Sequence, residues 1–396
     1  MPNTLLTPSQ VTREALRILH QKLNFVGNIN RSYDDSFANS GAKIGDTLKI
    51  RLPNRYVVRT GATLSAQDTT ETNTTLQIAT QKGVDLNFTS VDLTLSLDDF
   101  SKRILEPAMA VLAAAIESDA FSMQKDVYQL VGTPGTVPNA LLTYLQAKAR
   151  LDNSLAPPGD RSAILDPTAQ VTIIDALKGL FNDPGQLSKQ YKEGMMGRTA
   201  GFDWYANTLI PTQTNGAQAG TPAVNGGSQT GASLAINGMT GTTVITKGTV
   251  FTIAGVFEVH PETKVTTPRL QQFVATADLT TSAGAGTLAI SPSIVTSGAL
   301  QNVSASPANA AAITLVGAAS TGYNQQMAFH KDAFTFATAD LIMPKGVDFA
   351  SREVYDGISM RVVRQYDINN DKFPCRLDVL YGYKTIRPEL ACRVTS

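Results

Sequence analysis

Cysteine, histidine, tryptophan and charge are all scarce in this chain of 396 residues, which has two cysteines, three histidines and one tryptophan. Cys375 and Cys392 form no CxxC pair, so the sequence predicts neither a disulfide framework nor a thiolate zinc site. Charged residues make up 17% of the chain, against about 25% in ordinary soluble domains. Basic and acidic residues both number 33, so the net charge is zero. The chain therefore lacks the basic surface of a dedicated nucleic-acid binder.

Long hydrophobic runs are also missing. The longest uninterrupted apolar run, Ala108–Ile116, has nine residues, whereas a membrane span needs about 20. The first residues, MPNTLLTPSQ, lack the basic start and the apolar run of a signal peptide. We therefore expect a protein made in the reducing interior of a cell, with no membrane among its partners. Apolar residues are nevertheless 42% of the chain, which is ample for a packed core.

An N-terminal helix is predicted by Thr7 and Pro8, which suit the N-cap and the first helical position, followed by an apolar stripe that ends at Leu23. Basic residues line its other side. Two interpretations stay open: a terminal arm that docks on another molecule, or an amphipathic helix packed on its own domain.

Alternation of apolar and polar residues over 48–52, followed by the extended run 56–58, predicts a strand pair. The polar, threonine-rich stretch 60–81 is longer than most connections, and such loops are usually functional or mobile. Strand-like alternation resumes over 84–88 and 91–97. The pattern from Pro107 to Tyr128 then predicts one 22-residue helix, roughly 33 Å long at 1.5 Å per residue.

The region 138–205 is typical of an α/β segment, with helices expected over 140–152 and 168–180 and a strand over 162–165. At about residue 206 the composition changes, since only six of the 120 residues 206–325 are charged. This stretch predicts an inserted all-β domain, a small barrel or sandwich. Its expected strands cover 249–253, 257–260, 271–275, 287–290 and 313–316. A hairpin of 360–366 with 376–383 follows, and we expect the tail to complete the sheet begun before residue 206.

Catalytic motifs are not found. His20, His260 and His330 show no HxxxH spacing, and there is no GxSxG elbow, Walker A loop or dinucleotide-binding G-x-G-x-x-G. Gly284-Ala285-Gly286 is interpreted as a turn, and His330 as a residue flanking a strand. We therefore expect no catalytic residues, no cofactor and no metal site.

The nearest approach to a metal site is the segment 367–371, DINND, with Asp378 at position 12 of a calcium loop. Position 6, where the sharp turn needs glycine, is Lys372. The segment is also flanked by predicted strands rather than helices, so we interpret it as a polar hairpin turn.

The order of these parts resembles the major capsid proteins of short-tailed, double-stranded DNA bacteriophages, in the coat-protein family whose tailed-phage and herpesvirus capsid fold carries an inserted β-barrel domain. The likeness covers nearly the whole chain. It rests on GDTLKIRLP at 45–53, RILEPAMAVLAAAIESDAF at 103–121, ILDPTAQVTIIDALKGLFNDPG at 164–185, EGMMGRTAGFDWYANTLIPTQTNG at 193–216, NQQMAFHKDAFTFATADLIMP at 324–344 and RLDVLYGYKTIRPELACRV at 376–394.

The resemblance implies an α+β fold with the following parts: an N-terminal arm over 1–45, an extended loop with peripheral-domain strands over 46–97, a spine helix over 98–130, the axial domain over 131–205, the inserted β-barrel over 206–322, and the rest of the axial and peripheral domains over 323–396. It also implies a shell of hexamers and pentamers of the chain itself, assembled in the bacterial host cytoplasm with a scaffolding protein and a portal protein. The shell would enclose genomic DNA without sequence-specific binding. Salt bridges from a charged loop of the insert between capsomers are doubtful here, since Glu258, Glu262, Lys264 and Arg269 are nearly the only candidates.

Two other functions stay open at this point. Another virion component, such as a decoration or tail protein, would share the insert but not the spine helix and the order of the axial domain. A carbohydrate-active hydrolase with an attached β-domain would need a pair of carboxylates in a cleft.

Overall fold

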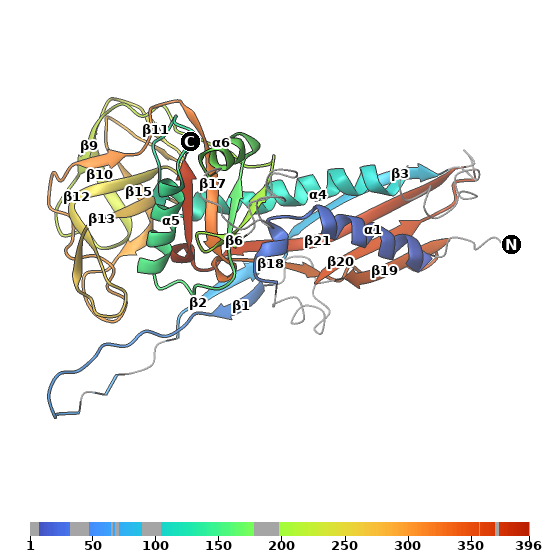
Figure 1. Ribbon diagram of the computed structural model, residues 1–396, viewed down its shortest axis with the longest axis horizontal. Helices are drawn as coiled ribbons and strands as arrows, with labels where there is room; N and C mark the ends of the chain where they lie inside the picture. Colours follow the sequence, from blue (N-terminus) through green and yellow to red (C-terminus); the bar gives the residue numbers. More distant parts are fainter. Residues whose placement is uncertain are drawn as a thin grey trace. The chain divides into compact units, whose positions relative to one another are not determined.

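The computed structural model describes residues 8–31, 47–64, 66–67, 71–88, 104–177, 198–355, 357–368 and 372–395 (Figure 1). The chain forms two compact units. The first unit contains residues Met1–Arg51, Asn73–Phe121 and Phe334–Ile386, and the second contains Leu52–Thr72, Ser122–Ala333 and Arg387–Ser396. Each unit is therefore built from segments that lie far apart in the sequence.

The first unit is built on a five-stranded antiparallel sheet. The long strand β21 (Phe373–Thr385) pairs with β3 (Thr80–Phe88) and with β18 (Phe334–Ala339) and β20 (Ile358–Arg364), and β20 pairs with β19 (Phe349–Tyr355). The expected hairpin of 360–366 with 376–383 is confirmed, with Arg361 opposite Asp378. The expected strand over 84–88 is confirmed as part of β3, whereas 91–97 lies outside the described residues.

Gly83 of β3 lies directly opposite Asp378 of β21, and this position needs a glycine. A Cβ atom at residue 83 would lie 2.5 Å from both the carbonyl oxygen of Leu377 and Oδ1 of Asp378. Asp378 is 1% exposed and accepts hydrogen bonds from Arg361 (2.6 Å) and Arg376 (3.0 Å). The missing side chain thus leaves room for a buried carboxylate with its two arginines.

The helix α1 (Pro8–Lys22) packs on α4 (Glu106–Phe121), β19 and β20 of its own unit. Its stripe of Ala15, Leu16 and Leu19 is buried there. The predicted helix is confirmed, and of its two interpretations the structure shows an amphipathic helix packed on its own unit. A short 3-10 turn, η1 (Val26–Asn28), follows it.

The helix α4 begins at Glu106, one residue before the predicted start. The predicted end at Tyr128 is wrong, because the α-helix ends at Phe121 and the chain continues as the 3-10 segment η4 (Ser122–Asp126). The amide of Val127 accordingly bonds to the carbonyl of Gln124, three residues back (3.1 Å). Apolar residues recur at nearly the same spacing in both helix types, so the sequence pattern did not reveal the change.

The strand β1 (Thr47–Arg51) pairs with β2 (Asn73–Gln77), so the predicted pairing of 48–52 with 56–58 is wrong. Residues 56–58 form no strand. The amide and carbonyl of Val57 are instead bonded to the side chain of Gln67, at 2.9 and 2.5 Å. The connection is therefore the whole segment 52–72, which we call the 52–72 loop.

The second unit contains a seven-stranded mixed sheet in the order β4-β22-β17-β5-β7-β6, with β8 also paired to β17. Its strands are β4 (Leu130–Val131), β5 (Arg161–Leu165), β6 (Arg198–Thr199), β7 (Phe202–Ala206), β8 (Thr212–Thr214), β17 (Gly322–His330) and β22 (Ala391–Thr395). The tail thus completes the sheet begun before residue 206, as expected: β17 lies between β5 and β22. The predicted helices are confirmed as α5 (Leu141–Asn153) and α6 (Pro167–Leu177), with 178–180 outside the described residues.

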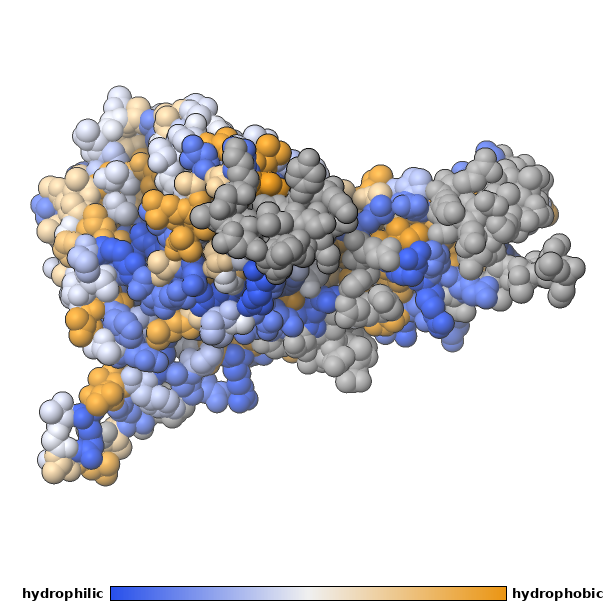
Figure 2. Space-filling view, viewed as in Figure 1, coloured by the Kyte–Doolittle hydropathy of each residue, from blue (hydrophilic) through white to orange (hydrophobic). Residues whose placement is uncertain are grey.

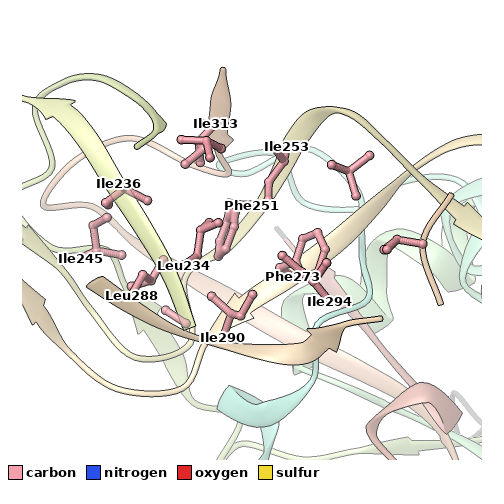
Figure 3. Packing of buried hydrophobic residues seen from close by; sticks show 14 of the residues in the cluster. Leu234, Ile236, Ile245, Phe251, Ile253, Phe273, Leu288, Ile290, Ile294 and Ile313 are labelled. Atoms are coloured by element: carbon pink, nitrogen blue, oxygen red, sulfur yellow. The ribbon is translucent and has the colours of Figure 1, made fainter. Parts of the chain in front are cut away.

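A second sheet of this unit is made only from strands between residues 220 and 315. Its order is β16-β12-β13-β15-β10-β9, and its strands are β9 (Gly220–Val224), β10 (Gly231–Met239), β12 (Val250–Val259), β13 (Thr266–Ala275), β15 (Gly286–Ile294) and β16 (Ile313–Leu315). The edge strand β9 also bonds to the segment just before β16, because the amide of Val224 donates to the carbonyl of Ala311 (3.0 Å) and its carbonyl accepts from the amide of Ala310 (2.9 Å). The sheet has its own apolar core, including Phe251, Phe273 and Leu288 (Figure 3). A small ladder of β11 (Val244–Ile245) with β14 (Leu279–Thr280) lies beside it.

The expected strands of this sheet are partly corrected. Residues 249–253 and 257–260 belong largely to one strand, β12, whose register shifts between Thr252 and Phe257. The strands β9 and β10 escaped prediction because they are rich in glycine and alanine rather than β-branched residues. The last two short helices, η5 (Lys331–Ala333) and η6 (Pro388–Leu390), also belong to the second unit.

Candidate functional site

The side chains that could bind a metal ion or take part in catalysis do not cluster among the described residues. Among the residues that the structure describes, no group of three or more His, Cys, Asp or Glu could hold a metal ion. Within the same residues, no helix is long and apolar enough to cross a membrane. Cys375 and Cys392 are buried and free, and burial raises the pKa of each thiol to about 12. Both thiols are therefore protonated and unreactive at neutral pH.

Two of the histidines have structural partners. Nδ1 of His260 accepts the amides of Glu262 and Thr263, both at 3.2 Å, in the turn between β12 and β13. His330 ends β17, where its Nδ1 accepts the amide of Asp332 at 3.2 Å and burial lowers its pKa. The side chain of His20 lies outside the described residues. The turn expected at residues 284–286 is present, since Gly284 has a φ of +77° and Ser282 bonds to Ala285.

The near match to a calcium loop is a hairpin turn between β20 and β21, closed by Asp367 and Lys372. Asp378, its candidate ligand at position 12, is buried on β21 and already bound by two arginines. Residues 369–371 lie outside the described part of the chain.

Three of the four candidate charges for contacts between capsomers are used inside the subunit. Glu258 is bound by Arg269 and by Arg150 of α5 at 3.1 Å. The ammonium of Lys264 donates to the carbonyls of Pro261, Ala299 and Gln301 at 2.7, 2.8 and 3.2 Å. Glu262 is exposed in the β12–β13 turn.

A cavity of the second unit is lined by two carboxylates, those of Glu258 and Glu389. Each of these carboxylates is bound in ion pairs to two arginines. The hydrolase interpretation needs a pair of carboxylates in a cleft, and both carboxylates here are already engaged in ion pairs.

The 52–72 loop is an extended segment (Figure 1) that carries exposed apolar side chains. Its side chains Tyr56, Val58 and Leu64 are 56%, 89% and 82% exposed. The loop keeps its form through local bonds, because Arg59 donates to the carbonyls of Gly61 and Thr63 and Gln67 spans the loop to Val57. Figure 2 shows apolar and hydrophilic residues mixed along it. Exposed apolar side chains on a preformed loop are typical of a surface that meets another protein.

Charges of both signs lie on this loop, which contains Arg55, Arg59, Asp68 and Glu71. Arg55, at the base of the loop, lies 3.7 Å from Glu389 of η6. Arg59 donates to two carbonyls of the loop itself. The loop thus presents apolar side chains together with balanced charge.

The family model "P22 coat protein - gene protein 5" matches residues 28–393. No curated protein matches the sequence. Among solved structures, a protein of Mycobacterium phage Che8 is 12% identical with a TM-score of 0.48, over 94% of this chain and 90% of that one. The capsids of cyanophage P-SCSP1u and Ralstonia phage GP4 are 10% and 8% identical, both with TM-scores of 0.43. They cover 89% and 95% of this chain, and 83% and 91% of the other chains.

The family match places the chain in the class of bacteriophage capsid proteins, which are structural proteins rather than enzymes. The chain belongs to the P22 coat protein family. The resemblance seen in the sequence is thereby confirmed, as is the α+β class of the fold.

Proposed function

We propose that this protein is the major shell subunit of a bacteriophage, which assembles with many copies of itself, as hexamers and pentamers, into an icosahedral capsid around double-stranded DNA. The observation that carries the proposal is the coat-protein match over residues 28–393. The exposed apolar side chains of the 52–72 loop support it, because a shell subunit must offer surfaces to its neighbours.

Assembly first forms a precursor shell on a scaffolding protein in the host cytoplasm, with a portal protein at one vertex. A chain with zero net charge suits this role, since identical copies meet without long-range repulsion. Each contact between subunits is weak, about 4 kcal/mol and hence millimolar by itself. Closure of the shell engages several such contacts at once, which makes the assembly permanent while single errors stay reversible.

Electron microscopy of the purified protein tests this function. We expect closed shells or capsomers in negative stain when the protein is concentrated together with the scaffolding protein. Light scattering then shows particles far larger than a small oligomer. Protein that stays monomeric at high concentration, with and without scaffold, would contradict the proposal.

A further inference from the structure

A cavity of about 90 Å³ in the second unit lies where several segments of the chain converge. Arg55 comes from the base of the 52–72 loop, Arg150 from α5, and Arg269 from β13. The rest of the lining is largely polar and includes the side chains of Asn153 and Gln301. Three guanidinium groups from distant parts of the sequence therefore face one small space.

Glu258 of β12 is one of two carboxylates in the lining, and it has two arginine partners. Arg150 lies 3.1 Å from its Oε2, and Arg269 contacts its Oε1. The side chain of Glu258 is 18% exposed, and those of Arg150 and Arg269 are 21% and 33% exposed. The single negative charge of Glu258 is thus paired with the positive charges of two arginines.

Glu389 of η6 is the second carboxylate, and it also has two arginine partners. Arg387 lies 3.1 Å from its Oε1 and Arg55 lies 3.7 Å from the same atom. The four arginines around Glu258 and Glu389 therefore exceed the carboxylates by two positive charges.

Lys264 adds a further positive charge beside the cavity. Its ammonium is bonded to the carbonyls of Pro261 and Gln301, two residues of the lining. Burial lowers the pKa of Lys264, and the positive charge of Arg55 lowers it further. The local potential around the cavity is therefore positive.

The concentration of charge at this point stands out against the rest of the inserted stretch. Only six of residues 206–325 are charged, and Glu258, Lys264 and Arg269 are three of them. The net charge of the whole chain is zero, but four arginines surround only two carboxylates at this cavity. The side chains of these four arginines are between 21% and 39% exposed, and an anion that entered the cavity would offset their partly desolvated positive charge.

We propose that this cavity binds one small oxyanion of the phosphate type between Arg55, Arg150 and Arg269. The planar guanidinium fork matches the geometry of phosphate oxygens and can donate two parallel hydrogen bonds. The bound anion links the base of the 52–72 loop to α5 and to the β12–β13 hairpin.

The size of the cavity favours a free anion over a nucleic-acid backbone. A water molecule needs about 10–15 Å³ of such space, so 90 Å³ accommodates a group of a few non-hydrogen atoms. A phosphodiester carries a sugar on each side, and is therefore a larger group than inorganic phosphate. Inorganic phosphate is therefore the probe to use.

Calorimetric titration of the unassembled, full-length subunit with inorganic phosphate tests the proposal, with sodium chloride added to hold the ionic strength constant. We expect a saturable 1:1 heat with phosphate and none with chloride. The same phosphate concentration raises the melting temperature, because a ligand that binds only the folded state stabilises it. A single-stranded oligonucleotide is expected not to compete.

Two variants locate the site. In Arg55→Gln, Glu389 keeps its partner Arg387, so the fold is preserved while phosphate binding weakens about tenfold or more. Arg59→Gln is the matched control, because Arg59 lies in the same loop, donates to loop carbonyls and is not part of the cavity lining. Phosphate binding by this variant is expected to be unchanged. Asn153→Asp places a carboxylate at the exposed rim and also weakens binding. Absence of a saturable heat, equal loss in both arginine variants, or competition by the oligonucleotide would overturn the proposal.

Discussion

Glu117 of α4 is a carboxylate that is almost completely buried, with 1% of its side chain exposed. Its two oxygens accept the amide of Phe25 at 2.9 and 3.2 Å, just after the N-terminal helix. The ring of Phe25 stacks on Phe121 with the centroids 4.6 Å apart. Burial raises the pKa of Glu117 to about 7, while bonds from the backbone amides of residues 24–26 oppose this shift.

The raised pKa predicts that Glu117 makes the stability of the protein depend on pH. Between pH 4.5 and about 7 the folded state holds a proton that the unfolded state has lost, so the free energy of unfolding falls as the pH rises. The shift corresponds to about 3 kcal/mol, an upper figure for this group. Urea unfolding of the wild type and of Glu117→Gln at pH 5 and pH 8 measures this contribution of Glu117 to the free energy of unfolding. The stability of the wild type relative to the variant should decrease at pH 8, and parallel pH profiles would contradict the prediction.

At the scale of elements, β4 is an edge strand of the seven-stranded sheet, yet its first residue is paired on the open side. The side-chain amide of Gln272 of β13 accepts the amide of Leu130 at 2.9 Å and donates to its carbonyl at 3.0 Å. The side-chain amide of Gln272 thus makes the two hydrogen bonds that the backbone of a neighbouring strand would make with Leu130. A strand edge with unpaired amides and carbonyls otherwise invites pairing with another chain, and Gln272 satisfies both groups of Leu130.

Replacing Gln272 by leucine should leave the amide and carbonyl of Leu130 without partners. We expect a loss of about 2–3 kcal/mol, since each buried polar group without a partner costs about 1–3 kcal/mol. Hydrogen exchange at the Leu130 amide checks this and should become much faster in Gln272→Leu. The amide of Ile164 on β5 of the same sheet serves as the internal control and should exchange as in the wild type. Unchanged exchange at Leu130 would show that the pairing is unimportant.

At the scale of the whole molecule, we expect the exposed side chains of the 52–72 loop to affect assembly of the shell without affecting folding of the subunit. Val58 and Leu64 are 89% and 82% exposed, so they contribute little to the stability of the subunit. Val58→Asp and Leu64→Asp should therefore give folded subunits with an unchanged melting temperature that fail to form shells. Thr60→Asp adds the same charge at a polar, exposed position of this loop and should still assemble. Shells of normal yield from both apolar variants, seen in negative stain, would exclude these side chains from subunit contacts.

Local periodicity predicted most of the elements because each depends on neighbours in sequence. The helices α1, α5 and α6 and the β20–β21 hairpin lie where their patterns placed them. The errors occurred where the partner is distant. The ladder of β1 is made with β2, beyond a long loop, and the α4 helix changes to 3-10 bonding without a change of apolar spacing. The glycine-containing strands β9 and β10 are held by pairing within the sheet rather than by their own propensity.

The sequence alone determined the family, the low charge of the inserted stretch and the absence of catalytic motifs, because these are properties of composition and of residue order. Only the tertiary structure decided which charges come together. Arg55, Arg150, Glu258, Arg269 and Glu389 span more than 300 positions, and no spacing rule connects them. The same holds for Gly83 beside Asp378 and for Glu117 beside Phe25. Electrostatic and steric contacts act through space, so chain folding creates them between residues whose positions in the sequence are unrelated.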